Sequence, residues 1–447
     1  MSQQFFVKEY GTLYIKGEKH NEGDVAVNLP TFHNLWNSIL ENKTRDLDSV
    51  MSIHTRAGRQ FIRIGKYVGT IQTKDGATIE ILPKIYRTDG AEENDIKECK
   101  RIFLRMLRHL PGITSKSFQD ASLETLLNFP ILECYIIGYL NEVDSIFRDG
   151  LKSNYKRETH RTPYLKGQLM IEKQIAQNIT DMSRFICRSE IYTLDIPQNR
   201  LIVSCLHKIQ QVSISSENKI RAANLRAAFD GVSCSANVEA DLITAKNANR
   251  LYNSYSTIIE WSEQLLKNKG FTTFSGQYIN QSLLFPAEQL FEGFIAHLFK
   301  KYAKDFIVKE QHRQYFLVDN HSGRTMFRLR PDLYLEKSDN KQDEPFIIDT
   351  KWKILDSVKI NHNYLMDIKD MYQLYSYGKK YGYKLNTIPK LILIYPYSNS
   401  FTKPLDLFYY EKNDAQTGIQ LYVAPFDLSE PSTYHDQINK ILRLGII

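Results

Sequence analysis

The sequence predicts a multidomain α+β protein in which three regions differ in their hydrophobic pattern. Short alternating runs fill residues 1–91, helical spacing dominates residues 92–275, and residues 276–447 mix helical and strand patterns. The chain of 447 residues can hold two or three domains, and its 42% hydrophobic content suffices for a core in each. We therefore expect a β-rich N-terminal domain, a mainly helical middle domain and a C-terminal α/β domain with a mixed central sheet.

Composition excludes several classes of protein. No run approaches the roughly 18–20 apolar residues that span a bilayer, and the first residues lack a basic segment followed by a long apolar one. We expect a cytoplasmic protein with no membrane partner. The cysteines are odd in number and far apart, without the paired spacing of zinc or redox sites, so we interpret them as reduced thiols: Cys99, Cys134, Cys187, Cys205 and Cys234.

The first region contains a hairpin signal. Two alternating apolar runs, residues 67–72 and 78–82, flank Asp75-Gly76, a dipeptide typical of tight hairpin turns. Pro83 then ends the second predicted strand, because proline cannot donate a hydrogen bond to a neighbouring strand.

The middle region combines helical spacing with a local excess of positive charge. Apolar residues recur every three or four positions over 99–110 and 124–147. Residues 148–188 hold nine Lys or Arg against four Asp or Glu, which accounts for +5 of the net charge of +7. This stretch predicts a phosphate-binding surface; the alternative is a solvated face of an ordinary helical domain. The candidate DNA contacts are Lys152, Tyr155, Lys156, Arg157, Arg161 and Lys166.

The third region follows a boundary at residues 270–281, which are rich in Gly, Thr, Ser and Asn. Its first predicted helix covers residues 287–302 and starts after Pro286. Glu288 and Glu292 both flank the apolar stripe of that helix, and either could face the sheet. The stripe comprises Phe291, Phe294, Ile295, Leu298 and Tyr302.

Asp349-Thr350-Lys351 ends an apolar run that predicts a buried strand. The alternation of side chains along a strand puts Asp349 and Lys351 on one face. A lone charge in such an interior costs several kcal/mol unless it is paired or bound to a metal. The alternatives are therefore a structural ion pair and a functional site.

Pro331-Asp332 supplies a second carboxylate. We expect a strand to begin at Arg328, and the polar connection 337–345 to form a hairpin that brings Asp332 close to Asp349. Alone, Asp332 is more typical of a turn. Two neighbouring carboxylates, however, suit Mg²⁺, which is usually held by one or two of them together with water and substrate phosphate. Lys351 would then orient or deprotonate the attacking water.

A helix over residues 367–381 and a buried strand over 391–396 complete the pattern. Asp370, Gln373 and Tyr377 share one helical face, so this polar row can line a neighbouring site. The stripe expected to be buried comprises Ile368, Met371, Tyr375 and Gly378.

In this order, the motifs resemble those of the PD-(D/E)XK nuclease superfamily, which implies a restriction-endonuclease-like fold for residues 276–447. The segment from Gln373 to Tyr377 is similar to the Gln-X-X-X-Tyr element of RecB-type nucleases. More closely, the chain resembles McrC, the nuclease subunit of McrBC-type modification-dependent restriction systems. Weaker upstream similarities are Leu82-Pro83-Lys84, Gly150-Leu151 with Tyr155, Lys166-Gly167-Gln168-Leu169 and the segment from Asp195 to Asn199.

The resemblance implies a subunit that cuts DNA, with methylated DNA as substrate, after a hexameric AAA+ GTPase like McrB recognises modified cytosine and translocates. The sequence has no Gly-X-X-X-X-Gly-Lys-Ser/Thr loop, so GTP would act only through that partner. In the family the β-rich front region docks on the ring, and the Asp75-Gly76 hairpin is our candidate docking element. Two copies would be needed for a double-strand break.

The resemblance also assigns roles to the site residues. It implies Mg²⁺ as cofactor, with Mn²⁺ as a substitute, held by Asp332, Asp349, the Thr350 carbonyl and Glu292 acting directly or through water. Glu288 is the second choice for the helical acid. The implied catalytic residues are Asp332, Asp349, Lys351, Glu292, Gln373 and Tyr377.

Two other functions fit the same residues. In one, the nuclease fold is a non-cutting scaffold that activates the partner NTPase, although an intact Asp332, Asp349 and Lys351 argue against it. In the other, the chain is a stand-alone RecB-like DNA repair nuclease, against which the β-rich front region argues.

Overall fold

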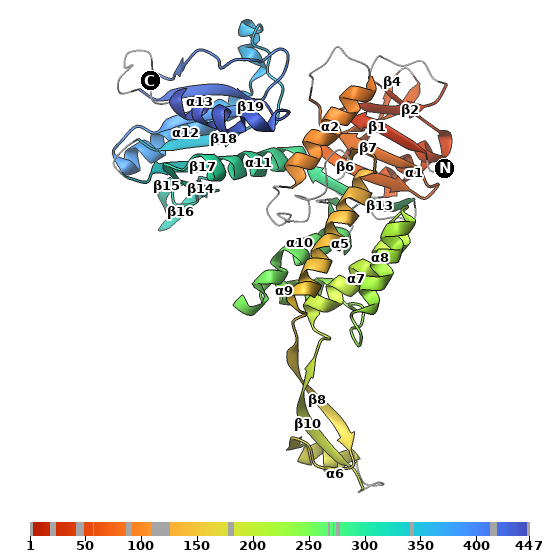
Figure 1. Ribbon diagram of the computed structural model, residues 1–447. Helices are drawn as coiled ribbons and strands as arrows, with labels where there is room; N and C mark the ends of the chain where they lie inside the picture. Colours follow the sequence, from red (N-terminus) through yellow and green to blue (C-terminus); the bar gives the residue numbers. More distant parts are fainter. Residues whose placement is uncertain are drawn as a thin grey trace. The chain divides into compact units, whose positions relative to one another are not determined.

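A computed structural model describes residues 3–17, 24–41, 49–56, 58–85, 92–108, 126–177, 183–266, 269–270, 272–273, 278–339, 344–411 and 418–444 (Figure 1). The described residues form two compact units. The first combines those of Met1–Thr114, Ser122–Asn128 and Phe274–Ile447, and the second comes from Phe129–Thr273. The three-region division made from the sequence stays a prediction, because spatial compactness does not test which segments fold independently. None of the described helices is long and apolar enough to cross a membrane.

The first unit begins with a four-stranded sheet in the order β1-β7-β6-β13. The predicted hairpin is confirmed, since β6 (Tyr67–Thr73) and β7 (Thr78–Leu82) pair antiparallel around Asp75-Gly76. β1 (Gln4–Lys8) pairs parallel with β7, and β13 (Ile279–Pro286) pairs antiparallel with β6. A strand from the C-terminal part of the chain therefore completes the N-terminal sheet.

Gly69 makes the pairing of β6 with β13 possible. Its φ of +138° is a conformation that side chains rarely adopt, and an added Cβ would lie 2.0 Å from the carbonyl oxygen of Leu283. A side chain at this position would separate the two strands.

A second four-stranded sheet packs against the first. Its order is β3-β2-β5-β4, and its apolar face shares a core with α1 and the first sheet, in which Phe32, Leu35 and Ile62 are fully buried. The elements are β2 (Thr12–Ile15), β3 (Val25–Val27), α1 (Leu29–Glu41), β4 (Met51–Arg56) and β5 (Arg59–Ile64). Helix α2 (Glu92–Leu107) follows, and packs against β7 and α11.

The six-stranded sheet of the first unit has the order β14-β17-β18-β19-β21-β20. β14, β17 and β18 pair antiparallel, whereas β18, β19 and β21 run parallel, so the predicted mixed sheet is confirmed. The strands are β14 (Phe306–Glu310), β17 (Leu333–Lys337), β18 (Phe346–Thr350), β19 (Lys390–Pro396), β20 (Phe408–Tyr409) and β21 (Gln420–Phe426). The accompanying helices are α11 (Ala287–Tyr302), α12 (Ile368–Leu385) and α13 (Tyr434–Leu444).

Several sequence predictions for this region need correction. The strand expected from Arg328 begins at Leu333, because Pro331 cannot donate to the ladder. β14 and the hairpin of β15 (Phe316–His321) with β16 (Arg324–Arg328) were not predicted. Ile368 is 62% exposed rather than buried, because it lies in the first turn of α12.

The second unit has a helical core. Trp261 stacks on Tyr135 with ring centroids 4.7 Å apart, and both side chains are fully buried. The buried carboxylate of Glu133 accepts hydrogen bonds from the Ser213 hydroxyl and the Asn218 amide. The helices are α5 (Ile131–Asp149), α7 (Pro197–Val212), α8 (Ser216–Ala227), α9 (Val238–Lys246), η1 (Arg250–Tyr255) and α10 (Ser256–Leu266).

An antiparallel arm extends from this helical core (Figure 1). β8 (Asn154–Thr162) pairs with β10 (Phe185–Thr193) along its whole length, and β9 (Gln168–Leu169) and α6 (Ile171–Gln177) complete the arm. The basic stretch over 148–188 thus contains β8, β9 and the start of β10 beside the short α6, so a mainly helical interpretation of it is wrong. The residues of β8 are polar on both faces, so the sequence gives no alternation to detect.

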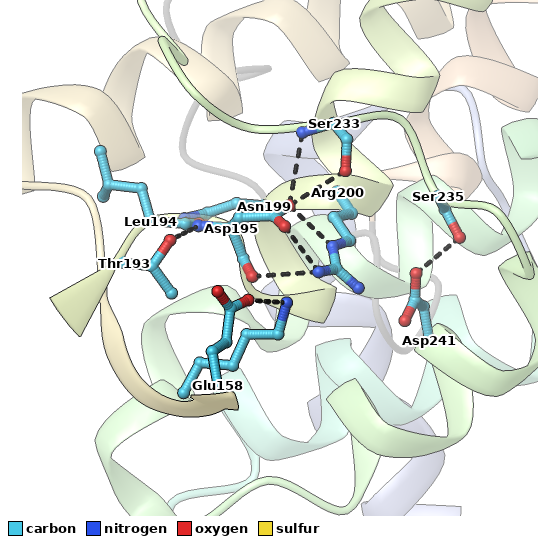
Figure 2. Close-up of polar contacts among 10 residues, drawn as sticks. Glu158, Thr193, Leu194, Asp195, Asn199, Arg200, Ser233, Ser235 and Asp241 are labelled. Carbon is cyan, nitrogen blue, oxygen red and sulfur yellow. Dashed lines mark hydrogen bonds and ion pairs between the residues drawn. The ribbon is translucent and has the colours of Figure 1, made fainter. Parts of the chain in front are cut away.

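A polar cluster fixes the point where β10 leads into α7 (Figure 2). The Asp195 carboxylate accepts hydrogen bonds from Arg200 Nε and Nη2, at 2.7 and 2.6 Å. It also accepts from the hydroxyl of Ser233 at 3.2 Å, and Asn199 Nδ2 donates to the Leu194 carbonyl at 2.8 Å (Figure 2). The Arg200 hydrogen bond lowers the pKa of Asp195 to about 2, so this pair stays ionised at neutral pH.

Candidate active site

The candidate site lies where β18 ends. Ile347 and Ile348 are fully buried between the neighbouring strands, and they carry Asp349 into the interior, where it is 1% exposed. Lys351 follows just outside the strand, with 24% of its side chain exposed. The predicted common face is confirmed, because the Lys351 ammonium forms an ion pair with Asp349 Oδ2.

Asp332 is held against β18 by two hydrogen bonds. Its Oδ2 accepts from the Thr350 amide at 2.7 Å and from the Thr350 hydroxyl at 2.8 Å. Its carbonyl accepts from the Gln311 amide at 2.9 Å, so both ends of the residue are anchored. The predicted proximity of Asp332 to the Asp349 strand is therefore confirmed.

Asp349 carries the strongest sign of function. Among the described residues, nothing hydrogen-bonds to its buried Oδ1. Burial raises its pKa to about 7, and the charge of Asp332 adds to this, although Lys351 opposes it. An orphaned carboxylate oxygen beside a second carboxylate is costly in a folded protein unless a cation or substrate offsets it.

Glu292 belongs to the same acidic group, whereas Glu288 lines a neighbouring cleft. Burial and the charges of Asp332 and Asp349 raise the pKa of Glu292 to about 8, and Glu292 Oε1 accepts a hydrogen bond from the Gln311 side-chain amide. Glu288 is exposed. The electrostatics thus favour Glu292 as the helical acid.

Gln373 and Tyr377 link α12 to the lysine. Lys351 Nζ donates to Gln373 Oε1 at 3.3 Å, and Gln373 Nε2 donates to the Tyr377 hydroxyl at 2.7 Å. Asp370 Oδ1 lies 3.9 Å from the same ammonium. Burial lowers the pKa of Lys351, but the charge of Asp349 and its hydrogen bond outweigh this, so the pKa is raised overall. A permanently cationic Lys351 suits charge stabilisation and water orientation, and not proton abstraction.

Sequence reasoning missed Glu9 and Trp352. Glu9 follows β1, is 1% exposed, and its Oε1 accepts from the Lys84 amide at 2.9 Å and from the Trp352 indole. Trp352 directly follows Lys351, so the N-terminal sheet reaches the site through this bond. Burial raises the pKa of Glu9 to about 7. A cleft of about 450 Å³ opens here, lined by Glu9, Tyr10, Lys84, Glu288, Lys351, Trp352, Lys353, Ile354, Asp367, Asp370 and Pro396.

The residues fit a magnesium ion held by few protein ligands. Within the described ranges, no three His, Cys, Asp or Glu side chains are grouped closely enough to hold a metal among themselves. Asp332 and Asp349 form a carboxylate pair, and Mg²⁺ commonly takes one or two carboxylates and fills its remaining positions with water and phosphate. Burial raises the pKa of both carboxyls, and the charge of Asp332 raises that of Asp349 further; a bound cation would offset both effects. This arrangement favours a contact between Glu292 and the ion through a water molecule, and not direct ligation.

The six candidate DNA contacts come together on the arm of the second unit. All six are exposed; Tyr155, Lys156, Arg157 and Arg161 lie on β8, Lys152 precedes it by two residues, and Lys166 lies in the connection to β9. Two are engaged in ion pairs with glutamates, Lys156 with Glu158 at 2.7 Å and Arg157 with Glu190 at 2.8 Å. Both pairs are largely exposed, so they leave the cations available to phosphates.

A protein-family model described as "McrBC 5-methylcytosine restriction system component" matches residues 62–396. The chain belongs to this family. A search among curated proteins found no match. The match extends from β5 to the end of β19 and includes the entire acidic group, whereas Glu9 lies outside it.

Two solved structures from Thermococcus gammatolerans are similar. One is a refined half-complex from a tetradecameric assembly of McrB AAA+ hexamers with bound McrC; the identity is 15%, the TM-score is 0.63, and 100% of each chain is covered. At this identity the likeness shows the fold, an McrC-like α+β arrangement with several sheets. The other is the McrBC complex, with 16% identity, a TM-score of 0.49 and coverage of 67% of this chain and 88% of that chain.

Proposed function

We propose that this family member is the endonuclease subunit of a modification-dependent restriction system, and that it hydrolyses DNA phosphodiester bonds with Mg²⁺. The observation that carries the proposal is the buried Asp349, with one oxygen unpartnered among the described residues and the other paired with Lys351, next to Asp332. A structural ion pair explains the bond to Lys351, but it does not explain why the second oxygen is left without a partner.

The chemistry follows from the positions of the side chains. Mg²⁺, with Mn²⁺ as a substitute, would be held by Asp332, Asp349 and the Thr350 carbonyl, and would polarise the phosphate and acidify the attacking water. Lys351 orients that water and stabilises the negative charge that develops on the phosphoryl oxygens. Gln373 keeps the ammonium in place, because its carbonyl oxygen accepts from it.

We further propose that the chain docks on an AAA+ GTPase hexamer and stimulates it, so that GTP acts only through the partner. The similar Thermococcus gammatolerans McrC is bound to McrB AAA+ hexamers. The Asp75-Gly76 turn remains our candidate docking element, and Lys74, Asp75 and Gly76 are exposed. Because β6 and β7 are buried, deleting residues 73–78 would damage the sheet, and Lys74→Ala is the cleaner test of partner binding and GTPase stimulation.

The exposed basic arm of the second unit supports DNA as the substrate. On and around β8, this arm offers exposed cations and an aromatic ring, the combination that contacts phosphates and bases: Lys152, Tyr155, Lys156, Arg157, Arg161 and Lys166. In this proposal the substrate is methylated DNA, and complexes pair to break both strands.

The decisive experiment is cleavage of methylated and unmethylated plasmid with Mg²⁺, with and without GTP and the cognate NTPase, comparing the wild-type chain with Asp349→Ala. Methylation-dependent cutting that requires partner and GTP and is lost in Asp349→Ala supports the proposal. Stimulation of the partner GTPase without any cutting would instead identify a non-cutting activator. Cutting without the partner would identify a stand-alone RecB-like nuclease.

A further inference from the structure

The hairpin formed by β15 and β16 is largely exposed and lies near the acidic group in the sequence. Every residue of β16 is exposed, and three large apolar side chains of the hairpin face solvent: Leu317 at 47%, Met326 at 39% and Phe327 at 67%. Soluble proteins rarely gather apolar side chains on an exposed hairpin unless they contact a partner.

The hairpin is tied to the site on its N-terminal side and is closed at its base by a backbone hydrogen bond. On the entering side, the Gln311 side chain donates to Glu292 and its amide donates to the Asp332 carbonyl. On the leaving side, the Leu329 amide donates to the Tyr315 carbonyl at 2.9 Å, three residues before Asp332. The hairpin is therefore connected to Glu292 and Asp332 through Gln311.

The hairpin is strongly cationic. Residues 313–330 contain four arginines and one acid, Asp319. Asp319 is neutralised by Lys380 and Lys384 of α12, at 2.9 and 3.1 Å. In the described part of the chain, Arg324 and Arg328 form no ion pair, and the Arg328 guanidinium lies 4.8 Å from the centre of the Phe316 ring. The net charge suits a polyanion.

Phe327 is unusual in both backbone and exposure. Its φ of +57° is uncommon for an aromatic residue and is costly unless the surroundings impose it. The phenyl ring nevertheless points into solvent and gains little from burial. Apolar side chains held in this way are used by DNA-binding proteins as stacking platforms or wedges at base steps.

We propose that the β15–β16 hairpin holds the DNA beside the scissile phosphate, with Arg324 and Arg328 on backbone phosphates and Phe327 against a base. This rests on the proposed function, since it assigns the substrate of that site a binding element. The hairpin acts in the same unit as the acidic group and is distinct from the basic arm.

The test is DNA binding by the full chain in an Asp349→Ala background, which removes cleavage from the readout. Fluorescence anisotropy on a short duplex across a salt series should show weaker binding for Arg324→Ala/Arg328→Ala. The slope of log K against log salt should fall by about 2, because each lost phosphate contact releases about one counterion fewer. Lys403→Ala/Lys440→Ala removes two charges from other exposed positions of the same unit, and should leave the slope unchanged.

Phe327 is tested separately with a duplex that contains 2-aminopurine, whose fluorescence rises when it is unstacked. Binding of a chain with Phe327 intact should raise this fluorescence. Phe327→Ala should abolish the rise and bind the duplex about fivefold or more weakly, whereas Phe327→Trp should retain the rise. Thermal melting of each variant checks that the chain is folded.

The proposal is overturned if the chain alone does not bind DNA, or if the arginine variant binds with the wild-type salt slope. It is also overturned if that variant loses only stimulation of the partner GTPase, which would make the hairpin a protein-docking surface. Failure of the nuclease assignment is seen independently, as cleavage that survives in Asp349→Ala while the hairpin variants still lose DNA binding.

Discussion

Glu9→Gln should make the first unit less sensitive to pH. The Glu9 carboxyl is 1% exposed, and burial raises its pKa from 4.5 to about 7. A raised carboxyl pKa means that the folded state binds the proton more tightly than the unfolded state does. The protonated Glu9 side chain therefore contributes its full stabilisation below pH 4.5, and this stabilisation is lost as the pH rises towards 7. This rise in the Glu9 pKa corresponds to roughly 3 kcal/mol in the free energy of unfolding, at about 1.36 kcal/mol per pKa unit.

Glutamine cannot ionise, yet its amide oxygen can accept the hydrogen bonds of Lys84 and Trp352. Between about pH 5 and about pH 8.5, the free energy of unfolding of the wild type should therefore fall by about 2–3 kcal/mol relative to Glu9→Gln. Comparing two pH values cancels any pH-independent cost of burying the new NH₂ group.

Hydrogen exchange of peptides from β1 and β7, measured in EDTA across a urea series, would report this unit separately from the helical one. Glu288→Gln is the matched control, because Glu288 lines the same cleft but is exposed. An unchanged difference between wild type and Glu9→Gln at the two pH values would refute the electrostatic reasoning, and with it the raised pKa of Glu9.

Three further predictions follow from the sites. Lys351→Ala should fold normally but cleave DNA on the order of 10²–10³-fold more slowly, the typical effect of removing one charge-stabilising donor. Melting curves check that the variant is folded, and full activity would contradict the catalytic role of Lys351. Mg²⁺ binding should weaken as the pH falls below 8 and should release protons, because Asp349 and Glu292 have pKa values of about 7 and 8 without metal. Titration calorimetry measures both effects, and pH-independent binding would place the ion elsewhere. Asp195→Asn should lower the free energy of unfolding by on the order of 1 kcal/mol at pH 7, because Arg200 lowers the Asp195 pKa from 3.8 to about 2 and solvent screens part of this interaction. The loss should shrink progressively below pH 4; hydrogen exchange at the start of α7 measures it, and a constant loss down to about pH 2 would argue against the ion pair.

The part of the site that rests on local periodicity could be predicted from the sequence. Strand alternation correctly put Asp349 and Lys351 together, and helical spacing put Gln373 and Tyr377 on one face. The choice between Glu288 and Glu292 could not be made in this way, because both flank the same stripe. Only the position of the helix over the sheet decides which of the two glutamates faces the other carboxylates.

The missed features have different physical causes. Glu9 contacts a residue 343 positions away, and nothing in its local sequence indicates this. The strand β8 is polar on both faces and β16 is exposed on both, so neither shows the apolar-polar alternation of a half-buried strand in its sequence. For β16 a signal was available in the Ser322-Gly323 turn, since Gly323 has a φ of +79° and both flanking segments contain β-branched or aromatic residues.

The pairing of β13 with β6 matters for anyone who divides this protein into fragments. A fragment that starts at residue 287 would keep the acidic group but would lose the strand that closes the N-terminal sheet. The N-terminal fragment would in turn display the uncovered edge of β6, whose seven residues are all buried in the intact chain. Such an edge is a template for pairing between molecules, so fragments are expected to aggregate even where each half has a complete core of its own. DNA binding and cleavage should therefore be separated in this protein by point substitutions and not by truncation.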